Sequence, residues 1–184
     1  MGRSDDLQIL SMLRNRKTRD IGFRLLMNTY KERIYWYIRR LVIIHEDAED
    51  ILQETFINAY RYIGRFKGGS RIYTWLYRIA TNECARHFKK RKKELQKVEI
   101  DSKLMNSIET IDTDDEAMIW KKFQKAILQL PEKQRIVFHM RYYEGLSYKE
   151  MGEILNSQEN ALKTNYHYAT ERIKAYLKED SDEK

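Results

Sequence analysis

The scarcity of chain-breaking residues is the feature that most constrains the fold of this chain. Its 184 residues contain one proline and seven glycines. An all-β sandwich or barrel needs a turn every few residues, and such turns depend heavily on glycine and proline. Hydrophobic residues make up 42% of the chain, which is enough for helical cores and too much for general disorder. The sequence therefore predicts an all-α fold.

A reversal of charge near the middle of the chain indicates two domains. The segment 86–93 is strongly basic, whereas the segment 99–116 is acidic and lacks a clear apolar period. We interpret the acidic stretch as part of a flexible acidic linker at 95–114. The linker would join two small helical domains, one of long amphipathic helices at 4–94 and a compact one at 115–178.

Composition also limits the class of partner and the cellular compartment. The formal net charge of +7 and the pI of about 9.3 favour a polyanionic partner such as nucleic acid. A single cysteine, Cys84, excludes an internal disulfide and a cysteine-based zinc site. Charged residues interrupt every apolar stretch that could serve as a signal peptide or a membrane span. We therefore expect a cytoplasmic protein without membrane insertion.

The segment 47–63 is predicted to form an amphipathic helix. Its apolar stripe at helical spacing comprises Ile51, Leu52, Phe56, Ala59, Tyr60 and Ile63. The solvent side carries Asp47, Asp50, Glu54, Asn58 and Arg61. The acidic start of this face is compatible with a metal site, a docking surface for a basic partner, or favourable charges near a helix N-terminus. Metal binding ranks lowest, because no matching carboxylate pair stands out on another helix.

A second helix is predicted to start near Ile72 and to run into the basic segment 86–93. Its expected core stripe is Trp75, Leu76, Ile79 and Ala80, and its mostly polar face is Thr74, Arg78, Asn82, Ala85 and Lys89, with Tyr73 and Tyr77 beside it. Basic and aromatic residues together suit unpaired nucleic acid. A solubilising helix end explains the basic run equally well when it is considered by itself.

The C-terminal third predicts a helix-turn-helix within a small helical core. One helix is expected to end at Pro131, and Ser147-Tyr148-Lys149-Glu150 forms a capping box that opens a short helix. Gly152 inside this helix suggests a close crossing, and Asn156 tolerates a left-handed turn. The apolar stripe of the last helix comprises Leu162, Tyr166, Ala169, Ile173 and Leu177.

The other face of the last helix presents Asn160, Lys163, Thr164 and His167, which could reach bases or phosphates in a major groove. A plain helical core with a solvated outer face is the alternative. The capping box, short helix, turn and apolar register agree with one another, so we favour DNA binding. A helix-turn-helix in the same chain also favours nucleic acid as the partner of the basic segment 86–93.

Three motifs resemble the sigma-70 family of RNA polymerase sigma factors. Residues 47–60, DAEDILQETFINAY, resemble the second conserved region of the family. Residues 66–82, FKGGSRIYTWLYRIATN, resemble the segment that handles the minus-ten promoter element in extracytoplasmic-function members. Residues 130–135, LPEKQR, and the following helix-turn-helix resemble the fourth region. The motifs occur in family order and span most of the chain from about residue 20 to 177.

The resemblance implies a protein that binds core RNA polymerase and directs promoter recognition, promoter opening and transcription initiation, without a catalytic site or cofactor of its own. The polymerase-docking residues it implies are Asp47, Asp50, Gln53, Glu54 and Asn58. The residues implied for the minus-ten strand are Lys67, Arg71, Tyr73, Trp75, Arg78, Asn82 and Lys89, with Asn82 as the best candidate for a flipped base. Those implied for the minus-thirty-five duplex are Arg141, Asn160, Lys163, Thr164, His167 and Tyr168. An anti-sigma factor is a further expected partner.

Two functions from other classes remain as rivals. A stand-alone helix-turn-helix regulator should bind duplex DNA tightly by itself, whereas a sigma factor should bind it weakly without polymerase. A metal nuclease built on Asp47, Asp50 and Glu54 should cleave DNA in a magnesium-dependent reaction.

Overall fold

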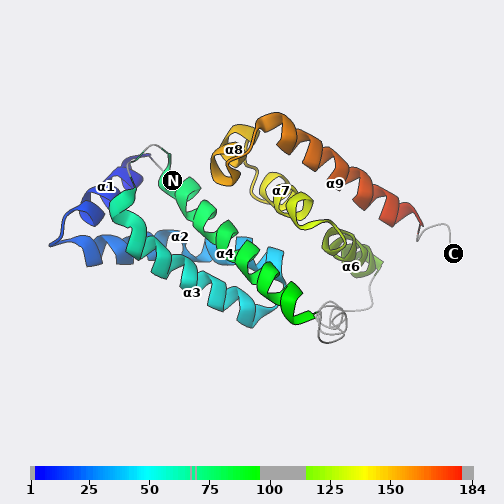
Figure 1. Ribbon diagram of the computed structural model, residues 1–184, viewed down its shortest axis with the longest axis horizontal. Helices are drawn as coiled ribbons and strands as arrows, with labels where there is room; N and C mark the ends of the chain where they lie inside the picture. The colour runs from blue at the N-terminus through cyan, green and yellow to red at the C-terminus, as the bar shows by residue number, and fades with distance from the viewer. Residues whose placement is uncertain (1–2, 67, 69, 96–114, 180–184) are drawn as a thin grey trace. The chain divides into compact units, whose positions relative to one another are not determined.

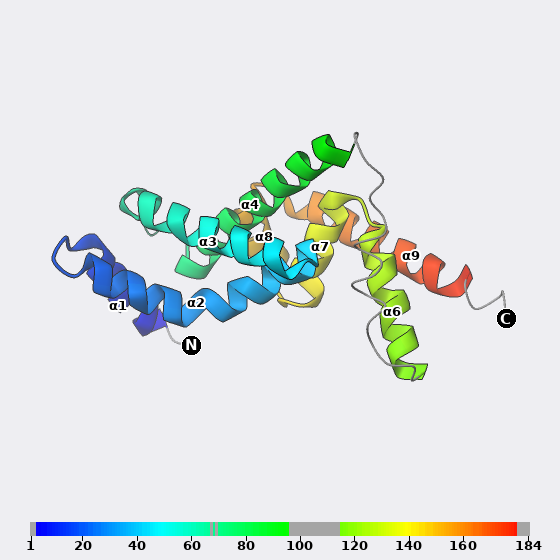
Figure 2. The same cartoon turned by 90° about the horizontal axis from the view of Figure 1, so that it is seen from below.

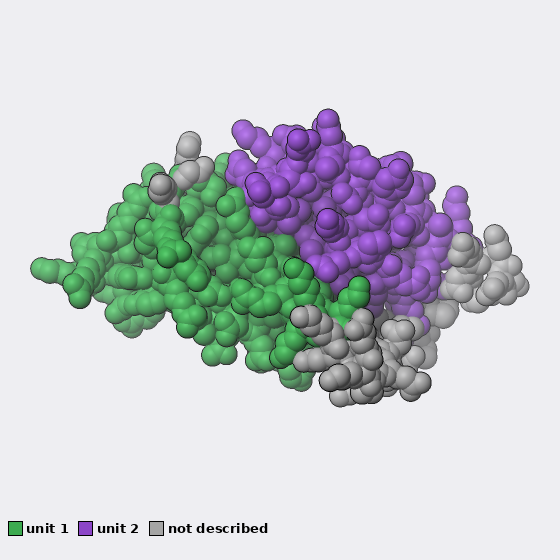
Figure 3. All heavy atoms as spheres, viewed as in Figure 1, with its two compact units in different colours: residues 1–93 green, residues 94–184 purple. Residues whose placement is uncertain are grey.

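The computed structural model describes residues 3–66, 68, 70–95 and 115–179. Every regular element in these residues is a helix (Figure 1), which confirms the predicted all-α class. The chain consists of two compact units, residues 1–93 and residues 94–184 (Figure 3). The linker expected at 95–114 lies outside the described residues, apart from Leu95, which is the last residue of a helix.

Unit 1 is built around the long helix α2 (Arg19–Val42). Its elements are α1 (Arg3–Arg14), α2 (Arg19–Val42), α3 (His45–Tyr62), the short 3-10 helix η1 (Ile63–Arg65) and α4 (Ile72–Leu95). α2 packs against both α1 and α3, as Figure 2 shows. The core that they enclose includes Ile9, Leu13, Leu26, Ile34, Ile38, Leu41, Leu52, Phe56, Leu76 and Ala80. Burial of these side chains is the main stabilising contribution to the unit.

The predicted apolar stripe of α3 is confirmed with one exception. Ile51, Leu52, Phe56, Ala59 and Ile63 are buried. Tyr60 is 38% exposed, so the expectation that it belongs to the core is wrong. Its hydroxyl donates a 2.9 Å hydrogen bond to Asp20 Oδ1, and the guanidinium of Arg19 lies 4.6 Å from its ring centroid. Tyr60 therefore sits at the edge of the core, where its ring packs and its polar tip stays in solvent.

The buried face of α4 differs from the predicted stripe. Leu76 and Ala80 are fully buried as expected, but Trp75 and Ile79 keep partial exposure, and Thr74 and Tyr77 are buried instead. Two groups on α2 make the burial of Tyr77 possible. Its hydroxyl accepts a hydrogen bond from Arg33 Nε at 3.1 Å, and its ring centroid lies 4.7 Å from that of Tyr37. Cys84 is also buried.

Unit 2 contains the helix-turn-helix. Its described helices are α6 (Asp115–Leu128), α7 (Glu132–Tyr142), α8 (Tyr148–Leu155) and α9 (Glu159–Glu179). α9 packs against the other three. The core between them includes Ala126, Ile127, Leu130, Phe138, Ala169 and Ile173. Pro131 separates α6 from α7, because its extended backbone places it at the N-cap of α7.

The predicted capping box and left-handed turn are present, and Leu162, Ala169 and Ile173 of the predicted α9 stripe are buried, whereas Tyr166 and Leu177 are half-buried. Ser147 Oγ accepts a 3.2 Å hydrogen bond from the Glu150 N–H, and Glu150 Oε2 accepts a 2.9 Å bond from the Ser147 N–H, which completes the capping box. Asn156 ends α8 in the left-handed conformation with φ of 50°. A Cβ at Gly152 would lie 2.8 Å from the carbonyl oxygen of Ser157, so the close approach is to the turn itself.

Candidate functional sites

The acidic face of α3 is solvent-exposed over its central turns. Asp50, Gln53 and Glu54 are all exposed, and their spacing places them on one side of the helix. Asp47 is half-buried and turns toward α4. Its Oδ2 lies 3.6 Å from Arg91 NH1, the distance of a loose ion pair, and 3.4 Å from His87 Nε2, longer than a strong hydrogen bond. Asp47 therefore helps to hold α4 against α3.

Asn58 does not lie on the acidic face. The prediction that it is a surface residue is wrong, because its side chain is 9% exposed. Its Nδ2 donates a 2.9 Å hydrogen bond to Glu83 Oε1 on α4. A buried amide needs such a partner, and no sequence pattern within α3 indicates it, since the partner lies 25 residues away. Asn58 is consequently an inter-helix contact.

An apolar groove runs between α2 and α3 beside the acidic face, and sequence reasoning missed it. Its lining is Phe23, Met27, Lys31, Glu49, Leu52, Gln53, Phe56, Ile57, Tyr60 and Arg61. Gln53 belongs to both the groove and the acidic face. The groove depends on two helices that meet in space, so the periodicity of either helix by itself does not reveal it. The two features together form a surface with apolar and acidic parts.

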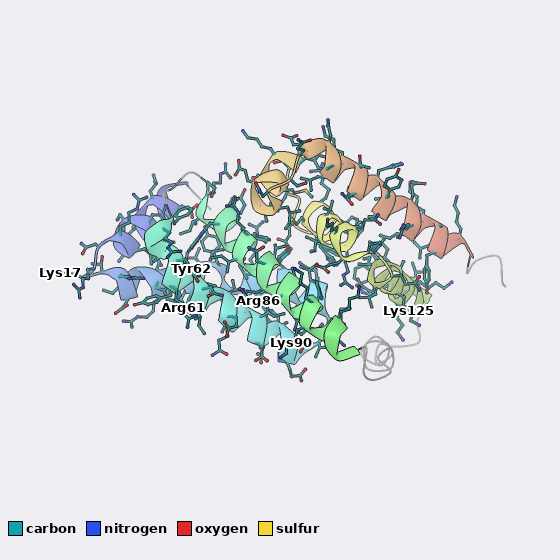
Figure 4. All side chains as sticks on the ribbon, in the orientation of Figure 1. Lys17, Arg61, Tyr62, Arg86, Lys90 and Lys125 are labelled. Atoms are coloured by element: carbon teal, nitrogen blue, oxygen red, sulfur yellow. The ribbon has the colours of Figure 1, made fainter. Side chains whose placement is uncertain are left out.

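The exposed side of α4 carries a stripe of amide and basic residues. Arg78, Asn82 and Lys89 are exposed as predicted, and Arg86 and Lys90, labelled in Figure 4, are exposed on the same helix. The spacing of about one turn between successive members aligns them along the helix axis. Such a stripe can follow a phosphate backbone while an amide reads a base edge.

The first turn of α4 contributes aromatic surface. Phe66 and Trp75 pack with ring centroids 5.1 Å apart, and Trp75 remains half-buried. Tyr73 is also half-buried, and the guanidinium of the exposed Arg71 lies 5.8 Å from its ring centroid. Lys67, the remaining residue predicted for this site, lies outside the described residues. Tyr73 and Trp75 offer partly exposed rings close to the N-terminus of α4, whereas Phe66 is buried beneath Trp75.

All predicted DNA-facing residues of α9 are exposed. They are Asn160, Lys163, Thr164, His167 and Tyr168. The hydroxyl of Thr164 donates a 3.0 Å hydrogen bond to the Asn160 carbonyl one turn earlier. The residues lie in the N-terminal half of α9, the part that a helix-turn-helix inserts into a groove. The structure therefore brings this predicted group together on one helix.

Tyr148 connects Arg141 with the α9 face, a role that sequence reasoning did not assign. The Arg141 guanidinium lies 5.2 Å and the Lys163 ammonium 5.8 Å from the Tyr148 ring centroid. Arg141 NH1 also donates a 2.9 Å hydrogen bond to the Leu146 carbonyl. The Tyr148 ring also neighbours the ring of Tyr166, and burial is the main reason why the pKa of Tyr166 is raised. Tyr148, the first residue of α8, is thus in contact with two cations, one from α7 and one from α9.

No group of three or more histidine, cysteine, aspartate or glutamate side chains among the described residues could hold a metal ion. In the same part of the chain, no helix is long and apolar enough to cross a membrane.

Both units match known family models. Residues 26–94 match sigma-70 region 2, and residues 120–173 match sigma-70 region 4. The RNA polymerase sigma-H factor of Pseudomonas aeruginosa is 32% identical over 162 residues, which cover 83% of this chain and 84% of that protein. The ECF RNA polymerase sigma factor SigW of Bacillus subtilis is 33% identical over 168 residues, which cover 86% and 90%.

Solved structures share the fold. The sigma factor RpoE of Bartonella quintana, in complex with the anti-sigma factor NepR, has a TM-score of 0.69 at 24% identity over 85% of this chain and 96% of that one. CnrH, in complex with the cytosolic domain of CnrY, has a TM-score of 0.69 at 18% identity over 96% and 99%. The chain therefore belongs to the sigma-70 family of RNA polymerase sigma factors, in its extracytoplasmic-function group, and functions in promoter recognition and transcription initiation.

Proposed function

We propose that the three exposed surfaces divide the work of initiation between core polymerase and two promoter elements. The observation that carries this proposal is the placement of the α4 stripe and the α9 face on separate compact units. Two nucleic-acid surfaces on separate units suit two separated stretches of promoter DNA. The protein acts as a specificity subunit in the cytoplasm, and polymerase performs the chemistry.

The docking surface for polymerase is the acidic face of α3. Asp50, Gln53 and Glu54 are exposed, and their two carboxylates suit a basic helical partner, namely the clamp helices of the polymerase largest subunit. Asp47 lies beside this surface, where its carboxylate also contacts His87 and Arg91 of α4. Asn58 is not part of the docking surface in this proposal, since it is buried.

The separated minus-ten strand binds along α4 and the segment before it. Asn82 offers an amide for the edge of a flipped base, and Tyr73 and Trp75 offer partly exposed rings for stacking. The basic residues of this site contact the phosphate backbone; they are Lys67, Arg71, Arg78 and Lys89. Melted DNA needs both kinds of contact, because its bases are unstacked and its backbone is charged.

The minus-thirty-five duplex binds the N-terminal half of α9. Asn160, Thr164 and His167 face the base edges, and Lys163 and Tyr168 flank them. Arg141 reaches the DNA backbone from the end of α7. An anti-sigma factor completes the set of partners, by extension from RpoE, which is bound to one in its structure. When added in equal amount, such a factor should abolish initiation.

Run-off transcription tests the proposal directly. A pool of promoter sequences is transcribed by matched bacterial core polymerase with and without the purified chain. We expect transcripts enriched in paired upstream and downstream elements, and only in the presence of the chain. Core binding without any promoter-dependent initiation would contradict the proposal. Variants Asn82→Ala and His167→Ala should shift preference at the downstream and upstream elements respectively.

A further inference from the structure

A buried carboxylate lies between the docking helix α3 and the DNA-reading helix α4. Glu83 follows Asn82 on α4 and is 6% exposed. Its Oε1 accepts a 2.9 Å hydrogen bond from Asn58 Nδ2, and its Oε2 lies 2.9 Å from Arg86 NH1. Burial of an ionised carboxylate is costly unless its oxygens find donors. Here Oε1 has a donor from Asn58 on α3, and Oε2 has a donor from Arg86 on α4 itself.

Arg86 reaches from this buried contact into solvent. Its side chain is 71% exposed, although its NH1 is held by a glutamate that is almost completely buried. Arg86 lies about one turn after Asn82, on the exposed stripe that also contains Arg78 and Lys89, and Figure 4 labels it on α4. A guanidinium has five N–H donors in a fixed plane, so one ion pair leaves others for a second anion.

We propose that Arg86 binds the DNA phosphate beside the base that Asn82 reads, and that Glu83 is the positioning residue that aims the Arg86 guanidinium. The inference rests on the proposed minus-ten role of Asn82. A free arginine side chain loses much rotamer entropy when it is fixed on a phosphate. The ion pair with Glu83 fixes part of the side chain before DNA arrives, which lowers that cost.

Asn58 connects the Glu83–Arg86 pair to α3, the proposed polymerase-docking helix. It lies one turn after Glu54 on α3, and its amide holds the Glu83 oxygen that does not face Arg86. A glutamine at position 83 replaces one of these two oxygens with an NH2 donor, so in the present arrangement one of the two donors, Asn58 Nδ2 or Arg86 NH1, would face another donor. The two contacts therefore favour a carboxylate, and Glu83→Gln changes the charge and acceptor capacity of the side chain while keeping its size.

A double-mutant cycle with the full chain and core polymerase tests the inference. Glu83→Gln, Arg86→Gln and the double variant are compared by the rate of open-complex formation at a promoter that the unmodified chain opens. We expect each single variant to lower the rate about tenfold, the loss of one charge-assisted hydrogen bond, and the double variant to be no slower than Arg86→Gln. Arg24→Gln, on an exposed arginine of α2, is the matched control and should leave the rate unchanged.

Two results would overturn the inference. If Glu83 only adds negative charge beside the DNA, Glu83→Gln accelerates opening. If Glu83 acts through helix packing instead of through Arg86, its effect persists in the Arg86→Gln background. Thermal unfolding and polymerase association of each variant show whether the unit stays folded and bound.

The salt dependence of promoter binding reports the number of phosphate contacts, and a change in helix packing alone does not alter it. Loss of one phosphate contact on a single strand should reduce the slope of log affinity against log salt by about 0.7. We expect this reduction for Arg86→Gln even if Glu83→Gln fails to fold, and an unchanged slope would overturn the phosphate role. Failure of the proposed function has a different signature, because the unmodified chain would then open no promoter with core polymerase.

Discussion

Gly152 and Asn156 show how single residues set the geometry of the helix-turn-helix. Glycine is normally unfavourable inside a helix, by about 1 kcal/mol relative to alanine. At position 152 it is required, because a Cβ would lie 2.8 Å from the Ser157 carbonyl oxygen. Asn156 accepts φ of 50°, a conformation that is costly for most side chains. Together they allow α8 and α9 to meet across a short turn.

Gly152→Ala should therefore destabilise unit 2, although alanine favours helices. We expect a loss of about 1 to 3 kcal/mol in the free energy of unfolding, because the turn backbone must move to admit the methyl group. Urea denaturation measures it. Gly64→Ala is the control, since nothing lies within 4 Å of the added Cβ there. Equal stability of the two variants would show that the turn adapts freely.

Tyr166 makes unit 2 sensitive to alkaline pH. Burial is the first reason why its pKa is raised above the usual 10.0, so the folded unit disfavours the phenolate. The stability that follows is complete below the unfolded pKa and is lost as the pH rises through the higher folded pKa. Tyr166→Phe keeps the ring that stacks on Phe138 and should remove this loss. Denaturation series of both proteins across alkaline pH check it.

At the scale of elements, the two helices of the helix-turn-helix have different tasks. α8 is short and begins at a complete capping box, so its N–H groups find partners at Ser147 and Glu150. α9 is long, buries Leu162, Ala169 and Ile173, and keeps its opposite face in solvent. α8 therefore fixes the angle at which α9 is presented, and in the proposed function α9 supplies the DNA contacts.

Lys163→Gln should weaken promoter binding by a similar factor for all upstream sequences, because a lysine contact to phosphate carries no base information. The slope of log affinity against log salt should fall by about 0.9 for this duplex contact. His167→Ala should instead change the order of preference among upstream sequences. Titrations of holoenzyme on promoter variants at several salt concentrations separate the two effects. A change in preference with Lys163→Gln would reassign it to a base.

At the scale of the whole molecule, neither DNA surface has to bind tightly by itself. In the proposed function, polymerase brings the chain to the promoter, so once one DNA surface is bound, the second contact becomes intramolecular and its effective concentration is high. The chain without polymerase lacks this advantage at a closed duplex, because the minus-ten surface needs a melted strand. We therefore expect strong promoter binding only from the assembled enzyme.

Charge reversal on the docking face tests this assembly. Asp50→Lys combined with Glu54→Lys should lower polymerase association at least tenfold, because the exposed carboxylates would be replaced by charges of the partner's own sign. The fold should persist, since both residues are exposed. Binding to immobilised core polymerase and thermal unfolding are measured together. Unchanged association would remove the docking assignment.

A gel shift with duplex promoter DNA distinguishes this protein from a stand-alone regulator. We expect weak retardation by the chain alone and a specific complex when core polymerase is added. A tight and specific complex without polymerase would contradict the proposed division of DNA binding between the two units and would favour a stand-alone regulator. The comparison needs a fixed salt concentration, because the electrostatic part of the affinity depends on it.

The all-α class, the amphipathic helices α3 and α4, the capping box and the family motifs could be predicted from the sequence, because they depend on residues that lie within a few turns of one another, whereas the bounds of α1 and α2 were not predicted. The apolar stripe of α9 was predicted, since every member is on one helix. Tertiary structure decided which polar residues stay in solvent. Asn58 is buried because Glu83 lies across from it on α4, and Tyr77 is buried because α2 supplies Arg33 and Tyr37. The periodicity of one helix carries no information about the partner that a neighbouring helix provides.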